Sequence, residues 1–297
     1  MPRTTSDAAL NRRMRDLLQP GAGHLMPGAG NALTARVIEA TGHQMLMVSG
    51  AAVANTYLGV PDIGLVSLAE LAGHVAAIRD AVDLPILVDG DTGFGNAVNV
   101  VHTVRVLERA GANAIMLEDQ TYPKRCGHFE GKEVIPAAEM VQKIKAATDA
   151  REDDALVILA RTDARASEGL SAALERAHAY QEAGADLLFV EAPLDERELA
   201  EIPRAVPGLH LCNLVVGGKT PLLPRERLAE MGYAVVLYAN LALQASMLAM
   251  QQSLAHLHAT GSVEGIEDRL IGFRERQALV DADHYNTLSR RYGAQET

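Results

Sequence analysis

Cysteine is scarce in this chain, which has only Cys126 and Cys212 among its 297 residues. Two cysteines so far apart do not form the disulfide framework that stabilises small secreted domains. The first residues, 1–7, are mostly polar and contain no apolar segment of the signal-peptide type. We therefore expect both thiols to be reduced and the protein to be cytoplasmic.

Long apolar runs and an excess of positive charge are also missing. No uninterrupted apolar stretch approaches the roughly 18 residues that a membrane-spanning helix needs, so a membrane protein is not expected. The formal net charge is −11, from 27 Lys and Arg against 38 Asp and Glu. Because that charge opposes binding to phosphate polymers, nucleic acid is not an expected partner.

A repeated phrase is present instead, in which a helical stretch ends at a glycine and a short apolar run follows. The four glycines are Gly42, Gly111, Gly184 and Gly232. Four further apolar runs, near residue 25, at 84–89, at 156–161 and near residue 211, bring the count to eight strands. Eight strand and helix units in about 240 residues predict a (β/α)₈ TIM barrel. We place this catalytic domain at residues 1–260 and a C-terminal helical extension at residues 261–297.

A doubly wound parallel sheet is the alternative architecture. The glycines of G-D-T-G-F-G at residues 90–95 superficially fit a dinucleotide-binding turn. Their spacing is wrong, however, and an acidic residue heads the loop where a pyrophosphate would approach. The barrel is therefore the preferred interpretation.

Polar residues stand at the end of almost every predicted strand. They are Ser49, Asp89 with Asp91, Glu118 with Asp119, Arg161, Glu191, Asn213 and Tyr238. In a (β/α)₈ barrel the carboxyl ends of the strands converge on one cavity, so these side chains are expected to face the same bound molecule.

Oxygen ligands dominate this predicted cavity. Asp89, Asp91 and Glu118 supply carboxylates without a neighbouring pair of histidines or cysteines at zinc spacing, which favours Mg²⁺, with Mn²⁺ as a possible substitute. Arg161 beside such an ion favours a carboxylate or phosphate substrate.

Cys126 lies in a loop rich in charge, between Lys124-Arg125 and Gly127-His128. A thiol has an ordinary pKa of about 8.5, and neighbouring cations tune it readily. The alternative is a structural cysteine in a basic turn. The surrounding acids and bases favour a working cysteine that exchanges a proton with carbon.

From about residue 10 to beyond residue 280 the chain resembles the isocitrate lyase and phosphoenolpyruvate mutase superfamily. The matching phrases are P-G-A-G-N-A-L-T-A-R, V-S-G-A-A-V-A, G-V-P-D-I-G, V-D-G-D-T-G-F-G-N, L-E-D-Q, P-K-R-C-G-H, A-R-T-D-A, F-V-E-A-P and C-N-L-V-V-G-G-K-T-P. K-R-C-G-H is the most specific of them, because it is similar to the flexible-loop signature of the superfamily's carbon–carbon lyases.

The resemblance implies Mg²⁺-dependent retro-aldol cleavage of a 2-hydroxy dicarboxylate. By that resemblance Asp89 and Asp91 hold the ion and Glu118 supports its water shell, while Cys126 is the general acid. The other catalytic residues would be His128, Arg161 and Glu191. The residues that would bind the substrate or position the loop are Ser49, Gly50, Ala51, Asp62, Lys124, Arg125, Gly127 and Asn213.

Two departures from methylisocitrate lyases narrow the expected substrate. Hydroxyl-bearing residues are missing behind Asn213, and Gln244 stands where an arginine would grip a third carboxylate. The C-N-x-x-x-G-G-x-T-P pattern is similar to that of 2,3-dimethylmalate lyase and the petal death protein. The leading expectation is thus a 2-alkylmalate lyase that yields pyruvate and a short carboxylic acid. The alternatives are 2-methylisocitrate lyase, oxaloacetate decarboxylase, carboxyvinyl-carboxyphosphonate phosphorylmutase and a non-catalytic binding protein.

The segment 263–292 carries apolar residues at helical spacing beyond the eighth strand, including Ile266, Leu270 and Phe273. It could pack on its own barrel. Because such helices are exchanged between barrels in the family, the resemblance implies a homo-oligomer, with a tetramer expected.

Overall fold

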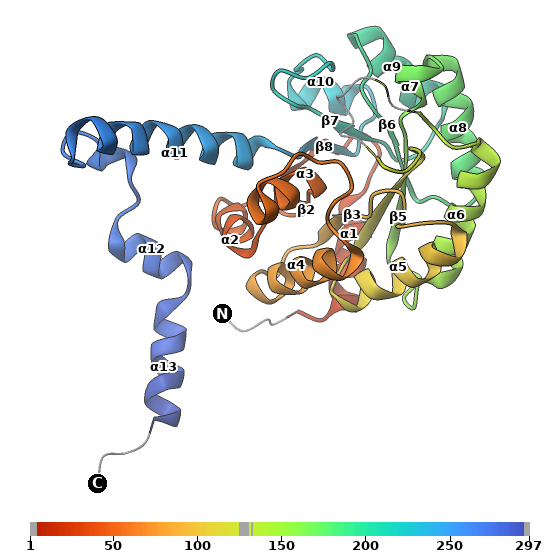
Figure 1. Cartoon of the computed structure of the whole chain (residues 1–297). Coiled ribbons are helices and arrows are strands. Elements are labelled where there is room, and N and C mark those ends of the chain that lie inside the picture. The colour runs from red at the N-terminus through yellow and green to blue at the C-terminus, as the bar shows by residue number, and fades with distance from the viewer. Residues whose placement is uncertain (1–4, 125–130, 132, 294–297) are drawn as a thin grey trace.

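Eight parallel strands form a nearly closed barrel in the computed structural model, which describes residues 5–124, 131 and 133–293 (Figure 1). The hydrogen-bonded order is β6-β5-β4-β3-β2-β1-β8-β7, and a bridge between Leu188 and His210 joins the two remaining edges. The strands are β1 (His24–Ala29), β2 (Leu46–Val48), β3 (Ile86–Asp89), β4 (Ala114–Glu118), β5 (Val157–Thr162), β6 (Leu187–Val190), β7 (Leu211–Asn213) and β8 (Val235–Tyr238). The predicted TIM-barrel fold is confirmed.

Helices surround this barrel and connect successive strands. They are α2 (Ala32–Ala40), α3 (Gly50–Val53), η1 (Ala54–Leu58), α4 (Leu68–Ala81), α5 (Ala97–Arg109), α6 (Ala137–Ala150), α7 (Ala164–Ser167), α8 (Leu170–Glu182), α9 (Glu196–Ala205) and α10 (Arg225–Glu230). The four punctuating glycines have φ values between 85° and 107°. Only glycine adopts that region freely, so each one ends its helix and turns the chain toward a strand.

Strand residues alternate between two buried layers. One set, including Leu87, Met116 and Phe189, fills the barrel interior. The other, including Val88 and Leu117, packs between the strands and the helices. Both faces of the strands are covered, which explains their nearly continuous apolar sequences.

Helix α1 (Asp7–Leu17) closes the end of the barrel where the strands begin. Its Met14 packs with the interior layer, and Arg15 Nε donates to the carbonyl of Ala155, just before β5. Asn11 accepts a hydrogen bond from Asn113 at the start of β4. Since this end is sealed, the opposite end, at the carboxyl ends of the strands, is the one open to a substrate.

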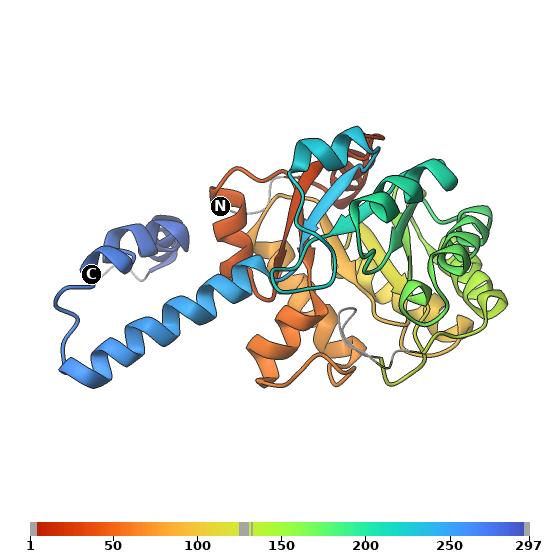
Figure 2. The same cartoon turned by 90° about the horizontal axis from the view of Figure 1, so that it is seen from above.

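The C-terminal arm, residues 241–293, projects away from the barrel (Figures 1 and 2). It consists of α11 (Leu241–Thr260), η2 (Glu267–Arg269), α12 (Phe273–Leu279) and α13 (Ala282–Tyr292). None of the residues in these four helices is buried. Helix α11 ends at Thr260, and its first half lies beside β1 and α3 of the barrel.

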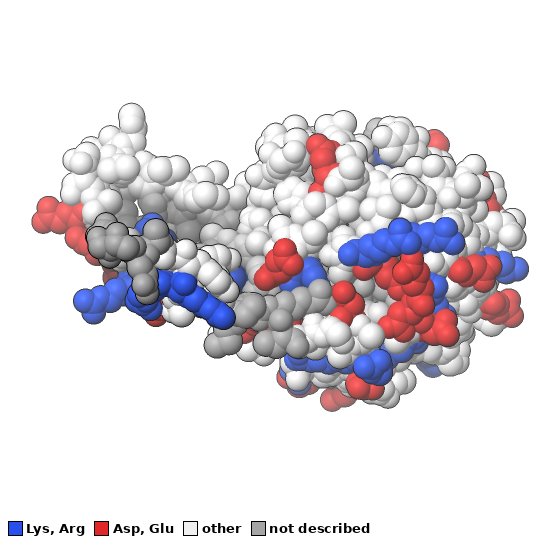
Figure 3. All heavy atoms as spheres, turned by 90° about the horizontal axis from the view of Figure 1, so that it is seen from below, with Lys and Arg blue, Asp and Glu red and all other residues white. Residues whose placement is uncertain are grey.

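The outer surface of the barrel mixes both signs of charge, as Figure 3 shows for one face. In the part of the chain that the structure describes, no helix is long and apolar enough to cross a membrane.

Candidate active site

One cavity at the carboxyl ends of the strands brings together seven of the eleven predicted site residues that the structure describes. Its polar lining includes Ser49, Asp62, Asp89, Arg161, Glu191, Asn213 and Asn240, and Ala51 lies among them. Its apolar lining comes from the interior layer of four strands and consists of Met47, Met116, Phe189 and Leu237, with Ala239 beside them. Gly50 and Asp91 lie in an adjoining hollow that shares Asp62 and Asp89 with the cavity. The cavity therefore has charged walls on an apolar base.

Arg161, at the end of β5, is the buried cation on one side of this cavity. Its Nε and Nη2 donate to the two carboxylate oxygens of Asp163, at 2.9 and 3.0 Å. Nη1 lies 3.0 Å from Glu118 Oε2, and Nη2 lies 3.4 Å from Glu191 Oε2. The guanidinium also lies over the Phe189 ring, 5.5 Å from its centre. These contacts fix the orientation of the guanidinium plane, and the three carboxylates stabilise its positive charge.

Lys124 is a second buried cation, which lies behind Asp62 of the cavity lining, and its side chain is only 3% exposed. Its Nζ lies 2.5 Å from Asp62 Oδ1 and 2.7 Å from Asp91 Oδ1. Burial alone would lower the pKa of the ammonium, but the surrounding carboxylates, Asp91 first, raise it well above its usual value. Lys124 is therefore a charged partner of the carboxylates that were predicted to hold a metal ion.

The backbone places these carboxylates through hydrogen bonds of its own. Gly50 N–H donates to Asp89 Oδ2, and Asp91 N–H donates to Asp89 Oδ1, both at 3.2 Å. Asp91 has a φ of 48°, in the left-handed region that non-glycine residues rarely adopt, and its carbonyl accepts from Glu118 N–H at 2.9 Å. Such strain persists where the surrounding structure enforces it, and it is common at functional sites.

Hard oxygen donors surround this end of the cavity, and they fit a divalent cation such as Mg²⁺. Glu118 Oε1 is buried and has no hydrogen-bond partner among the described residues. Burial raises the pKa of Asp91 to about 7, although Lys124 opposes the shift, and it raises the pKa of Glu118 well above its usual range. A cation would stabilise both ionised carboxylates. As the side chains stand, no group of three His, Cys, Asp or Glu within the described ranges converges on a single metal position.

Four predicted residues, Arg125, Cys126, Gly127 and His128, lie outside the described residues. The segment before them is held by two contacts to the loop that follows η1. Tyr122 donates from its hydroxyl to the Gly64 carbonyl at 3.3 Å, and Lys124 pairs with Asp62. Lys124, the last described residue before the predicted catalytic loop, therefore lies beside the carboxylates of Asp62 and Asp91.

Cys212, the other cysteine, lies on β7 with its side chain in the layer between strands and helices. Burial, together with the charge of Glu191, raises the pKa of its thiol. Cys212 is therefore a neutral core residue.

Two residues at strand ends do not face the cavity as predicted. Asp119 follows Glu118, and Tyr238 follows Leu237; because successive side chains point to opposite faces of a strand, both point outward. Tyr238 packs beside the outer apolar cluster, and Asp119 bonds to groups of β5 and α8. Fewer polar side chains therefore face the cavity than predicted, and the hydroxyl group that lines it belongs to Ser49 and not to Tyr238.

Two residues with roles in the site were missed by the sequence analysis. Asp163 holds Arg161, and Asn240, which lines the cavity, accepts from the Ser49 hydroxyl at 3.5 Å. Asp163 lies two positions after Arg161, so the alternation of strand side chains was the signal that could have found it. Asn240 lies just before α11 and carried no such signal.

Comparison with known proteins identifies the family. The family model for phosphoenolpyruvate phosphomutase matches residues 14–258. The chain is 40% identical to 2,3-dimethylmalate lyase of Eubacterium barkeri over 280 residues, which cover 94% of this chain and 97% of the relative. It is 41% identical to the chloroplastic carboxyvinyl-carboxyphosphonate phosphorylmutase of Arabidopsis thaliana over 289 residues, covering 96% and 85%. It is 42% identical to 2-methylisocitrate lyase of Aeropyrum pernix over 272 residues, covering 92% and 87%.

Solved structures agree with these relatives. A crystal structure of 2,3-dimethylmalate lyase superposes with a TM-score of 0.89 at 27% identity, covering 98% of this chain and 97% of the other. Oxaloacetate acetylhydrolase bound to 3,3-difluorooxalacetate gives 0.90 at 28% identity, covering 98% and 99%. Phosphonopyruvate hydrolase in complex with oxalate and Mg²⁺ gives 0.85 at 31% identity, covering 95% and 98%. The chain belongs to the phosphoenolpyruvate mutase and isocitrate lyase superfamily of enzymes.

Proposed function

We propose that this enzyme is a Mg²⁺-dependent carbon–carbon lyase that cleaves a 2-alkylmalate, such as 2,3-dimethylmalate, to pyruvate and a short carboxylic acid. The observation that carries this proposal is the cavity itself, which is lined by the carboxylates of Asp62, Asp89 and Glu191 together with Arg161, above an apolar base. An ion and an arginine suit the two carboxylates of a malate, and an apolar base suits its alkyl substituents.

Asp89, Asp91 and Glu118 are the residues that would hold Mg²⁺, because they present oxygen donors at the ends of β3 and β4. When bound, the ion supplies Lewis acidity that stabilises negative charge on the 2-oxygen and the adjacent carboxylate. Gly50 N–H, which bonds to Asp89, helps to orient that ligand. Ser49 and Ala51 line the cavity beside it, where they can contact the substrate carboxylate.

The proposed cleavage begins when a base takes the proton of the 2-hydroxyl group. The bond between C2 and C3 then breaks, giving the 2-oxo acid and an enediolate that retains the bonding electron pair. We assign the proton that the enediolate receives at carbon to the Cys126 thiol, with Arg125, Gly127 and His128 positioning the loop. One proton is lost at oxygen and one is gained at carbon, so no further reactant is needed.

Gln244 supports a dicarboxylate over a tricarboxylate. This residue of α11 donates from Nε2 to the Val216 carbonyl at 3.3 Å, so the amide is used to hold the loop after β7. The neutral amide of Gln244 cannot form an ion pair with a third substrate carboxylate. An arginine at this position would form a charge-assisted hydrogen bond worth about 1.5–3 kcal/mol. The similarity to 2-methylisocitrate lyases keeps that activity as the second candidate.

We also propose that the enzyme is a homo-oligomer, with a tetramer expected, in which the C-terminal arm packs on a neighbouring copy. The arm exposes large apolar side chains, among them Leu248, Leu254 and Phe273. Several large apolar side chains exposed along one arm are typical of a protein–protein interaction site. Light scattering after size-exclusion chromatography tests the assembly. A monomeric mass at micromolar concentration would contradict it.

The function is tested by measuring 2-oxo acid release from 2,3-dimethylmalate, 2-methylmalate, 2-methylisocitrate and oxaloacetate, with Mg²⁺ or Mn²⁺ and with a chelator. We expect metal-dependent cleavage of the alkylmalates and its collapse in Cys126→Ser, with Cys212→Ser as the matched control that retains activity. Preference for 2-methylisocitrate would establish the second candidate. Turnover of oxaloacetate alone, unaffected by Cys126→Ser, would indicate a decarboxylase, and turnover of none would leave the phosphorylmutase or a binding protein.

A further inference from the structure

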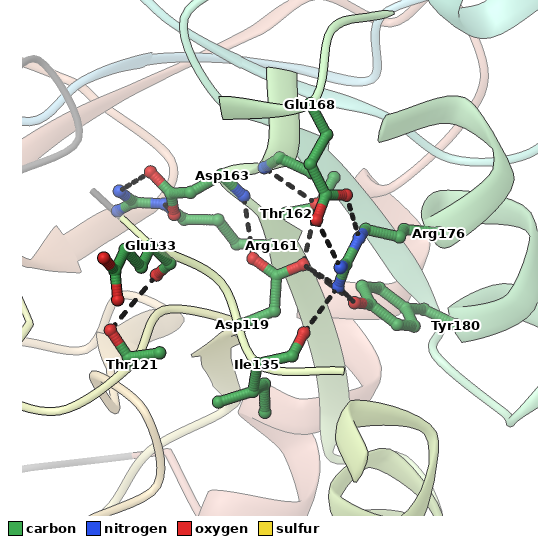
Figure 4. A network of polar contacts seen from close by, with 11 residues as sticks. Asp119, Thr121, Glu133, Ile135, Arg161, Thr162, Asp163, Glu168, Arg176 and Tyr180 are labelled. Carbon is green, nitrogen blue, oxygen red and sulfur yellow. Dashed lines mark hydrogen bonds and ion pairs between the residues drawn. The ribbon is translucent and has the colours of Figure 1, made fainter. Parts of the chain in front are cut away.

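Asp119 is a fully buried carboxylate outside the cavity, and it accepts four hydrogen bonds or ion-pair contacts (Figure 4). The Thr162 hydroxyl donates to Oδ2 at 2.8 Å, and the Tyr180 hydroxyl donates to the same oxygen at 2.7 Å. Arg176 Nη1 lies 3.4 Å from Oδ2. The Asp163 N–H donates to the other oxygen, Oδ1, at 2.9 Å. A buried charge is retained at such a position only where its neighbours satisfy it this fully.

The two oxygens of Asp119 serve two different parts of the structure. Oδ2 bonds to side chains, two of which, Arg176 and Tyr180, come from α8. Oδ1 bonds to the backbone at Asp163, the residue whose carboxylate holds both Nε and Nη2 of Arg161. A chain of contacts therefore runs from Asp119 through Asp163 to the guanidinium in the cavity.

Further contacts of Asp119, Thr121 and the Arg176 side chain connect the end of β4 with residues 133–135 and with β5. Ile135 N–H donates to the Asp119 carbonyl at 2.8 Å, and Arg176 Nη1 donates to the Ile135 carbonyl at 2.9 Å. Thr121 N–H donates to the Glu133 carbonyl at 2.9 Å. Asp119 N–H donates to the Arg161 carbonyl at 3.2 Å. The end of β4, the end of β5 and α8 thus meet at one carboxylate.

From these contacts we propose that Asp163 and, through it, Asp119 are positioning residues for Arg161: Asp163 holds the guanidinium directly, and Asp119 holds Asp163 from outside the barrel. The activity readout rests on the proposed function, whereas the position of the guanidinium does not. Asparagine at position 163 would present an NH₂ donor to a guanidinium N–H, so one of the two parallel bonds would be lost. A misplacement of about 1 Å at a reacting centre can cost about 100-fold in rate.

The variants that test this are Asp163→Asn, Asp119→Asn and Tyr180→Phe, each studied as the full-length enzyme by crystallography and by steady-state kinetics. Tyr180→Phe is the matched control, because it removes a donor to Oδ2 and leaves Oδ1 on Asp163. We expect the guanidinium of Arg161 to move in the two Asp variants and to stay in place in Tyr180→Phe. We expect kcat to fall by about 100-fold in Asp163→Asn with a smaller change in KM, and by about 10-fold in Asp119→Asn.

A double-mutant cycle separates positioning from a general structural role. In an Arg161→Gln background, Asp163→Asn should lower kcat by less than about 2-fold, because the residue through which it acts is gone. A lower unfolding temperature with unchanged kcat and an unmoved guanidinium in both Asp variants would overturn the proposal. If the wild-type enzyme cleaves no alkylmalate, the proposed function fails, and the guanidinium positions in the three crystal structures still decide this inference.

Discussion

Two buried cations, Arg161 in the cavity lining and Lys124 behind it, are held in different ways. Arg161 belongs to β5, and its carboxylate partners Glu118, Asp163 and Glu191 lie at or just beyond the ends of β4, β5 and β6. Lys124 belongs to a loop, and it pairs with Asp62 in another loop and with Asp91 just beyond the end of β3. The arginine is therefore part of a strand and is held by residues at strand ends, whereas the lysine joins two loops to the end of β3.

The chemistry of the two side chains matches this difference. A guanidinium is a planar fork whose hydrogen bonds fix its orientation, while an ammonium is a compact point charge on a flexible stem. We infer that Arg161 is a permanent part of the cavity wall. Lys124 neutralises carboxylates that a divalent cation would also bind, so its charge opposes that of the ion.

The largest effect is expected from Arg161→Lys, which keeps the charge and removes the fork. The ammonium cannot make the paired contact with Asp163 and also reach Glu118 and Glu191. We expect kcat/KM for alkylmalate cleavage to fall by about 10³-fold, the upper end of the cost of losing one well-placed donor. A loss below about 3-fold in steady-state assays would show that charge alone is sufficient and would remove the distinction between the two cations.

An intermediate effect is expected from Lys124→Met, which removes the competing charge and keeps the apolar stem. Calorimetric titration with Mg²⁺ should show binding about 10-fold tighter, equal to about 1.4 kcal/mol. Without metal, the variant should unfold at a lower temperature, because its carboxylates lose their cation.

The matched control is Lys145→Met on the exposed face of α6, which should leave Mg²⁺ affinity unchanged. Weaker Mg²⁺ binding in Lys124→Met would mean that the lysine supports the ion, which is the reverse of the account given above.

The smallest effect is expected from Arg165→Lys, at a second arginine fork that is partly exposed. Arg165 Nε and Nη2 donate to Glu198 at 2.9 and 2.6 Å, a geometry like that of Arg161, but the pair lies outside the cavity. We expect a loss below about 1 kcal/mol in unfolding free energy and unchanged kcat/KM. A large loss of activity here would show that fork geometry alone, and not its place in the cavity, causes the effect at Arg161.

The contribution of the Arg165–Glu198 pair to the unfolding free energy is expected to decrease at low pH. Hydrogen bonds from Arg165 hold the pKa of Glu198 below its usual 4.5, which burial opposes. The pair therefore stabilises the fold above pH 4.5 and loses that contribution as pH falls through the lowered pKa. Urea denaturation between pH 5 and about 3 should show a shallower loss in Arg165→Lys than in wild type.

The barrel could be predicted because its signals are local. Gly111 and Gly184 mark helix ends through their own backbone conformation, and apolar runs mark strands buried on both faces. The convergence of Asp89, Arg161 and Asn213 then follows from the fold. Their presence in one cavity needed no knowledge of individual contacts.

Other features depend on contacts between distant segments, and these could not be predicted. Asp119 and Tyr238 face outward because Glu118 and Leu237, the residues before them, face inward. The adjacent carboxylates Glu118 and Asp119 do not show from the sequence which of them faces inward. The burial of Lys124 requires a carboxylate from the loop of Asp62, which only the folded chain brings near.

The central claim, that a carbon–carbon bond is cleaved and a carbanion is then protonated, is tested most directly in deuterated water. Wild-type enzyme is incubated with 2,3-dimethylmalate and Mg²⁺, and both products are examined by NMR and mass spectrometry. We predict one solvent deuteron at the carbon next to the carboxylate of the short acid and none introduced by the enzyme into pyruvate. Release of both products without deuterium in the short acid, or enzyme-dependent deuteration of pyruvate alone, would contradict the mechanism.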